Sequence, residues 1–141
     1  MNKKFIENIQ KRVTDLLLTL SDNLQTAAKD QCSEMVRLVG CWILGENPEY
    51  EIEIYKGIFS DGSAHDILVI KDRKVLFLID PTIWQKFSES KNILVGSVNN
   101  MSEAVGLLEG KYGGMWKVSE SMKKCDENQQ QELLTIIKKN R

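Results

Sequence analysis

The sequence predicts an α+β fold in which a small antiparallel sheet packs against helices. Three observations lead to this prediction. Apolar side chains recur at helical spacing near both ends of the chain, over residues 3–20 and 126–139. Residues 50–56 alternate between apolar and polar side chains, as a half-exposed strand does. Residues 64–80 contain two apolar runs on either side of a short polar turn, which is typical of a β-hairpin.

Length and composition favour a single globular domain over residues 1–141. The chain has 141 residues, of which 42% are hydrophobic and 28% are charged. A chain of this size and composition buries a substantial core. The formal net charge is −1, and the basic and acidic residues are interspersed. The sequence therefore lacks the basic face that nucleic-acid binding requires, and we expect no nucleic-acid partner.

The distribution of apolar residues also bears on localisation. No stretch approaches the apolar length of a membrane-spanning helix, so we expect no membrane partner. The residues after Met1 include lysines but no long apolar core of a cleaved secretory signal. We therefore expect the protein to act in the cytoplasm, or to be secreted or delivered without a cleaved signal peptide.

Two helices are expected before the first strand. The first spans residues 3–20. Its apolar face consists of Phe5, Ile6, Ile9, Val13, Leu16, Leu17 and Leu20. Residues 24–31 are expected to form a connection or a partly helical approach. The second helix spans residues 32–44, with Gly45 as its C-terminal stop.

The three cysteines do not suggest a disulfide framework or a metal centre. An odd number cannot pair completely, and their spacing does not fit a metal site. The chain has only one histidine, so we expect neither a metal nor another cofactor. Cys41 is predicted to face the surface or a neighbouring helix, opposite the core side of the 32–44 helix. Cys32 lies at the start of that helix, where N–H groups and the helix dipole favour a thiolate and can hold an oxyanion. The alternative for Cys32 is a small buried apolar residue.

The hairpin places the single histidine next to a carboxylate. With Asp72 and Arg73 as a two-residue loop, His65 is expected opposite Asp80 at the open end. Directly opposed side chains have Cβ atoms about 4.5–5.5 Å apart. An acid that orients an imidazole forms part of a general-base device. Two other acids compete for this role: Asp61 in the preceding loop, and Asp66, which points to the other face of the sheet.

Both faces of the hairpin are apolar, so its strands are expected to be central and covered by helices. Pro81 is expected to end the second strand. The remaining segments follow from local signals: a short helical turn over the site at 82–87, a strand at 92–98, a helix at 102–108 and a mobile connection at 111–116. The last helix is expected to bury Leu133, Leu134, Ile136 and Ile137.

The order of these residues resembles the papain-like and transglutaminase-like cysteine enzymes. That family places a cysteine at a helix N-terminus, a histidine on a later strand and an acid at the end of the next strand. The stretch Ile79-Asp80-Pro81-Thr82 is similar to the family's pattern, whereas Ser33 stands where members carry a small residue or tryptophan after the cysteine. The resemblance covers roughly residues 25–90. It implies a papain-like core at about 25–98, flanked by helices 3–20 and 126–139.

The resemblance implies that Cys32 is a nucleophile, that His65 is a general base and acid, and that Asp80 orients His65. It also implies thiol-dependent acyl transfer on amide bonds of a protein substrate, by a glutamine deamidase, a cysteine protease or a transglutaminase-like enzyme. The short chain looks like bacterial effector and toxin domains of the group, which adds an inhibitory or immunity partner as an expectation.

Two questions stay open at this point. The family often supplies an oxyanion-hole donor from a glutamine, and Gln25 and Gln31 both lie upstream of Cys32. The second function hypothesis is a non-enzymatic α+β protein-binding module, with the acidic strand 51–53 and exposed aromatic side chains as its interface.

Overall fold

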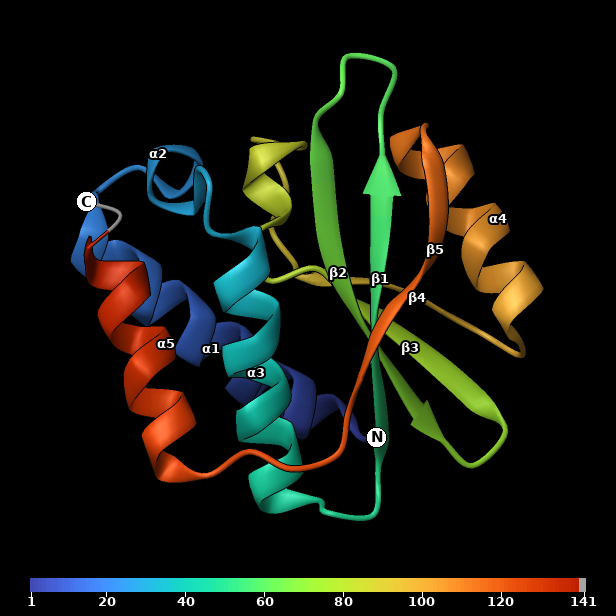
Figure 1. The fold of residues 1–141 in the computed structure, drawn as a ribbon, viewed down its shortest axis with the longest axis horizontal. Helices are drawn as coiled ribbons and strands as arrows, with labels where there is room; N and C mark the ends of the chain where they lie inside the picture. The colour runs from blue at the N-terminus through green and yellow to red at the C-terminus, as the bar shows by residue number, and fades with distance from the viewer. Residues whose placement is uncertain (140–141) are drawn as a thin grey trace.

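A five-stranded antiparallel sheet has helices on both of its faces (Figure 1). The computed structural model describes residues 1–139. The last two residues of the predicted 1–141 domain lie outside this range. The helices are α1 (Lys3–Leu20), α2 (Leu24–Ala28), α3 (Cys32–Glu46), α4 (Met101–Tyr112), α5 (Glu127–Lys139) and the 3-10 helix η1 (Ile83–Gln85). The strands are β1 (Glu51–Ile58), β2 (Ala64–Asp72), β3 (Val75–Ile79), β4 (Leu94–Val98) and β5 (Met115–Met122). They lie in the order β4-β3-β2-β1-β5, which confirms the predicted α+β class.

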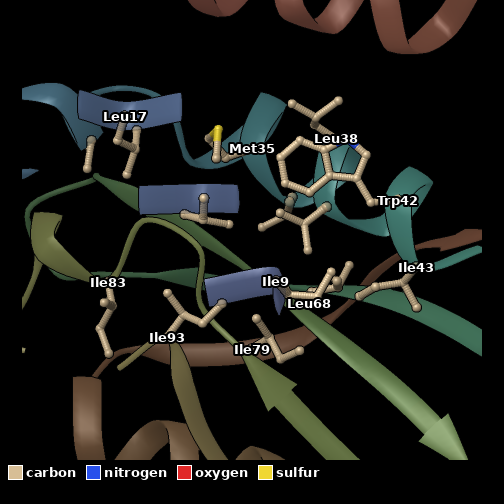
Figure 2. Packing of buried hydrophobic residues seen from close by; sticks show 14 of the residues in the cluster. Ile9, Leu17, Met35, Leu38, Trp42, Ile43, Leu68, Ile79, Ile83 and Ile93 are labelled. Carbon is tan, nitrogen blue, oxygen red and sulfur yellow. The ribbon is translucent and has the colours of Figure 1, made fainter. Parts of the chain in front are cut away.

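The larger core lies between the sheet and helices α1, α3 and α5. Figure 2 shows Met35 of α3 between Leu17 of α1 and Leu38 of α3, and Ile9 of α1 beside Leu68 of β2. Burying one side chain of this kind stabilises the fold by about 1.5–3 kcal/mol. The apolar stripe of the first helix therefore fixes α1 and α3 to the sheet.

The opposite face of the sheet is covered by α4 (Figure 1). Ile67, Val69 and Leu78 of the hairpin pack with Ala104 and Leu108 of α4. The hairpin strands are therefore covered on both faces, as predicted from their continuous apolar runs. Among residues 1–139, no helix has the length and apolar character required to cross a membrane.

The hairpin register differs from the predicted register by two residues. Asp72 pairs with Val75 and Leu68 pairs with Ile79, so the two-residue loop is Arg73 and Lys74. Arg73 adopts a left-handed conformation with φ 59°, which few side chains favour. Neither Arg73 nor Lys74 is a typical turn residue, so the sequence did not indicate where the two-residue loop lies. Because side chains alternate faces with a period of two, the two-residue shift leaves every predicted face unchanged.

Strand β5 is absent from the sequence prediction. Residues 111–116 were expected to form a mobile connection, but α4 continues to Tyr112 and β5 begins at Met115. The strand pairs with β1 at the edge of the sheet and buries only Trp116 fully. A mostly polar edge strand lacks the apolar run that identifies buried strands, so its pairing with β1 became visible only in the fold.

The cysteines correct a second expectation. Cys41 does not face the surface: it is 1% exposed and forms a disulfide with Cys125, with Cα atoms 5.2 Å apart. The bond joins the middle of α3 to the segment between β5 and α5.

Two predictions about the helices are also wrong. Gly45 does not stop α3, which continues to Glu46. On α5, Ile137 is buried, but Ile136 is exposed rather than buried as predicted.

We expect reduction of the disulfide to lower the stability of the folded chain. The bond closes a loop between positions 84 residues apart, and constraining such a loop in the unfolded chain contributes about 2–4 kcal/mol. The measurement is urea unfolding of the wild type and of Cys41→Ser/Cys125→Ser. Cys32→Ser is the matched control, because Cys32 is outside the disulfide. Equal unfolding midpoints for the double variant and the wild type would contradict the prediction.

Candidate active site

His65 and Asp80 meet at one end of the hairpin. His65 is the second residue of β2, and Asp80 follows the last residue of β3. Both are nearly inaccessible, at 1% and 0% exposure, and His65 Nε2 lies 2.8 Å from Asp80 Oδ2. In the observed register the two residues are diagonal rather than direct neighbours, a separation that long side chains bridge. The predicted contact between the histidine and the acid is therefore confirmed, although by a different pairing.

The Asp80 carboxylate is fully hydrogen-bonded by groups from three segments. Its Oδ1 accepts a hydrogen bond from the Thr82 backbone N–H at 3.1 Å. Its Oδ2 accepts one from the Tyr112 hydroxyl at 2.5 Å, in addition to the His65 contact. The Asp80 N–H donates to the Ile93 carbonyl at 2.8 Å. A buried charge is tolerated only when it is paired and hydrogen-bonded, and these contacts meet that requirement.

The environment of His65 raises its pKa. Burial of the ring acts to lower the pKa, but the charge and hydrogen bond of Asp80 outweigh burial, with further contributions from Cys32. The net result raises the pKa of His65 to about 9. The imidazole is therefore protonated at neutral pH.

Cys32 lies beside this imidazole at the start of α3. It is the free cysteine of residues 1–139 and is partly exposed. Its thiol is close enough to His65 for hydrogen bonding and charge to act between the two groups. The structure thus brings Cys32, His65 and Asp80 together in one site.

The start of α3 also differs from the other helix starts. No side chain caps its first-turn N–H groups. The other four α-helices in the described part of the chain are capped by Asn2, Asn23, Asn100 and Asp126. An uncapped helix start presents N–H groups and positive potential to a nearby thiolate or oxyanion. This arrangement is consistent with a reactive group at Cys32.

The rival acids lie elsewhere. Asp61 is exposed and accepts hydrogen bonds from the N–H and hydroxyl of Ser63. Asp66 is buried beneath α3, and its Oδ2 lies 3.9 Å from Arg37 Nη1. Burial raises the pKa of the Asp66 carboxyl. Arg37 also donates to Ser33 and pairs with Glu120, so this second cluster ties the first turn of α3 to β2 and β5.

Aromatic side chains that sequence reasoning missed enclose the His65–Asp80 pair. The Tyr112 and Trp116 rings lie 5.7 Å and 6.5 Å from the His65 ring, centroid to centroid. The Trp116 indole packs over Gly57 of β1, where a side chain would clash with the indole. The signal for this cluster was the Tyr-Gly-Gly-Met-Trp stretch, whose glycines indicated a turn but not which partners its aromatics would meet.

A polar cavity of about 560 Å³ adjoins His65. Gln25 of α2 and Gln85 of η1 line it, and Lys29 and Lys86 add positive charge. The Gln85 Oε1 is buried and has no hydrogen-bond partner within residues 1–139. Gln31 is positioned differently, because its side-chain amide is buried and donates to the Ile137 carbonyl. Of the two upstream glutamines considered from the sequence, Gln25 is therefore the one on the cavity wall.

In the described part of the chain, neither a metal cluster nor the cavity at the other end of the hairpin offers the groups of this site. Within residues 1–139, no group of three or more histidine, cysteine or acidic side chains is arranged to hold a metal ion. A cavity of about 1010 Å³ lies at the other end of the hairpin, between residues 49–50 and 71–75. It contains neither cysteine nor histidine.

The comparisons with known proteins give no match. No protein family matches the chain, and neither a curated protein nor a solved structure is significantly similar to it. The geometry of the site is therefore the basis for a proposed function.

We expect the stability of the fold to fall as the pH rises through the His65 titration. The pKa of about 9 in the folded chain lies above the ordinary value of 6.5, so the protonated ring stabilises the fold. This contribution is fully present below pH 6.5 and is lost as the pH approaches 9. Its size is about 3 kcal/mol, from 1.36 kcal/mol per pKa unit.

The test combines urea unfolding between pH 6 and 10 with an NMR titration of the imidazole. His65 is the only histidine, so its signal needs no assignment. His65→Gln should lack this part of the pH dependence. A wild-type midpoint near 6.5 in the NMR titration would contradict the proposed electrostatics.

Proposed function

We propose that the chain is a thiol-dependent acyl-transfer enzyme that acts on amide groups of a protein substrate. The observation that carries this proposal is the buried contact between His65 Nε2 and the Asp80 carboxylate, next to the Cys32 thiol at the start of α3. Nucleophilic cysteines need a neighbouring base and a third group that orients it. In this proposal Cys32 is the nucleophile, His65 the acid and base, and Asp80 the orienting group.

The first half-reaction forms a thioester. In this proposal Cys32 reacts as a thiolate paired with the imidazolium of His65. The thiolate attacks the amide carbonyl carbon, and the carbonyl electron pair moves to oxygen. Collapse of this tetrahedral intermediate breaks the C–N bond while His65 gives its proton to the leaving nitrogen. The products are ammonia or an amine and an acyl group on Cys32.

The second half-reaction restores the enzyme. His65, now neutral, takes a proton from a water molecule as the water oxygen attacks the thioester carbonyl. Collapse releases a carboxylic acid, and Cys32 and His65 return to their starting state. Backbone N–H groups at the start of α3 and the Gln25 side-chain amide are the proposed donors to the oxyanion in both steps.

The cavity next to His65 favours a glutamine side chain as the substrate group. Its wall carries the amides of Gln25 and Gln85, which offer hydrogen-bond donors and acceptors suited to another amide. Glutamine deamidation is therefore the proposed reaction, ahead of proteolysis or cross-linking.

The Cys41–Cys125 disulfide favours a place of action outside the cytoplasm. Disulfides form and persist mainly in oxidising compartments. We therefore propose that the chain reaches such a compartment, in line with the expected effector or toxin role and an inhibitory partner in the producing cell.

Alkylation tests the nucleophile directly. Because Cys41 and Cys125 are paired, iodoacetamide without reductant should add one group per chain, at Cys32. At pH 6 we expect the rate to exceed that of free cysteine by about tenfold, because a thiolate reacts and a thiol does not. His65→Gln should bring the rate down to that of an ordinary thiol. Tyr50→Phe, at the other end of the hairpin, should leave it unchanged. A wild-type rate equal to that of free cysteine would argue against an activated nucleophile.

Mass spectrometry of candidate target proteins tests the reaction class. Incubation with the wild type should convert a glutamine to glutamate, and Cys32→Ala should abolish the conversion while leaving the fold intact. Shortened products would indicate proteolysis instead, and joined products would indicate cross-linking. If Cys32 is alkylated no faster than an ordinary thiol and the chain binds a partner stably, the non-enzymatic binding module is favoured instead.

A further inference from the structure

The Asp80 carboxylate has two side-chain donors on the same oxygen, and the proposed reaction uses only one of them. His65 Nε2 lies 2.8 Å and the Tyr112 hydroxyl 2.5 Å from Asp80 Oδ2. The other oxygen accepts from the Thr82 backbone N–H, so it does not compete for Tyr112. Tyr112 therefore acts on the same atom that orients the imidazole.

Tyr112 is also held in a fixed place. It is the last residue of α4, and Gly113 ends the helix in a left-handed conformation with φ 76°. The Trp116 indole N–H donates to the Gly113 carbonyl at 2.8 Å, which fixes the turn after Tyr112. The Tyr112 ring contacts the Phe87 and Trp116 rings, with centroids 5.0 Å and 5.3 Å away. A hydroxyl on such a constrained ring cannot easily leave its acceptor.

The ring of Tyr112 has a second effect on the pair. It lies over the imidazole at 5.7 Å, tilted by 31°, on the side of the sheet that α4 covers. Burial and the Asp80 charge raise the pKa of Tyr112 well above its usual range, so the hydroxyl remains a donor over the working pH range. A donor that keeps its proton draws part of the carboxylate charge away from His65.

We propose that Tyr112 is a positioning residue of this site: its hydroxyl shares the Asp80 carboxylate with His65, and its ring closes the pair from the α4 side. The role rests on the proposed function, since it matters for catalysis only if His65 transfers protons there. Shared donation limits how strongly Asp80 stabilises the imidazolium through Nε2, and a less stabilised imidazolium more readily gives the proton on its other ring nitrogen to the leaving group.

The test is the NMR titration of His65 in Tyr112→Phe, which removes the hydroxyl and keeps the ring. With one donor fewer on Oδ2, the carboxylate interacts more strongly with the imidazolium, and the His65 pKa should rise by about half a unit. The groups that face His65 are Cys32 from α3, Asp80 after β3 and Tyr112 from α4, with Asp66 adjacent on β2. The titration is therefore repeated in Cys32→Ala, where no thiol titrates beside the ring.

The chain offers a matched control. The Tyr50 hydroxyl lies 3.5 Å from Asp72 Oδ2, at the other end of the same hairpin. Tyr50→Phe thus removes a tyrosine–aspartate contact far from His65 and should leave the His65 pKa unchanged. A purely structural role for Tyr112 would reduce the stability of Tyr112→Phe without moving the His65 titration.

A second measurement covers the case in which Tyr112→Phe does not fold. Wild-type chain grown with 3-fluorotyrosine carries a stronger phenol donor at all three tyrosines, of which Tyr112 contacts Asp80. Here the His65 pKa should fall. An unchanged or lowered His65 pKa in Tyr112→Phe, or an unchanged or raised one in the fluorinated chain, would overturn the proposal. These readouts do not involve turnover, so they remain valid if Cys32 proves not to be a nucleophile.

Discussion

The buried contact between His65 and Asp80 sets the requirements that the rest of the site meets. Both side chains are almost completely removed from water, and isolated charges in such surroundings are unstable. The hairpin brings the two groups together, but it leaves oxygen atoms of Asp80 that need donors. Thr82 and Tyr112 supply them from the segment after β3 and from the end of α4. The site therefore depends on two segments that follow the hairpin in the sequence.

The two faces of the sheet contribute different parts of the candidate site. The face covered by α1, α3 and α5 carries the larger core and presents Cys32 at the first turn of α3. The face covered by α4 carries the smaller core and the aromatic rings over His65. The thiol and the rings both adjoin His65, near the start of β2. The surroundings of His65 thus come from helices on both faces of the sheet (Figure 1).

A disulfide and the ion pairs of Arg37 hold α3 in this arrangement. The Cys41–Cys125 disulfide ties the middle of the helix to the segment that follows β5. Arg37 ties its first turn to Asp66 of β2 and Glu120 of β5. Strand β5 therefore supports the position of Cys32 as well as carrying Trp116. Its importance to the site contrasts with its weak sequence signal.

The sequence by itself determined the α+β class, the amphipathic first helix, the covered hairpin and the pairing of the only histidine with Asp80. These features follow from local periodicity, which alternation on a strand and spacing on a helix express directly. The predicted faces survived the two-residue error in register because side-chain orientation depends only on the parity of the position. The position of Cys32 at a helix start was likewise readable from its neighbours.

Only the tertiary structure decided which distant groups complete the site. The bond between Cys41 and Cys125, the pairing of β5 with β1 and the hydroxyl of Tyr112 on Asp80 each join residues far apart in the chain. No local pattern encodes such contacts, because they depend on how helices and strands pack in three dimensions. The charge state of His65 belongs to the same group, since burial and a neighbouring carboxylate set it together.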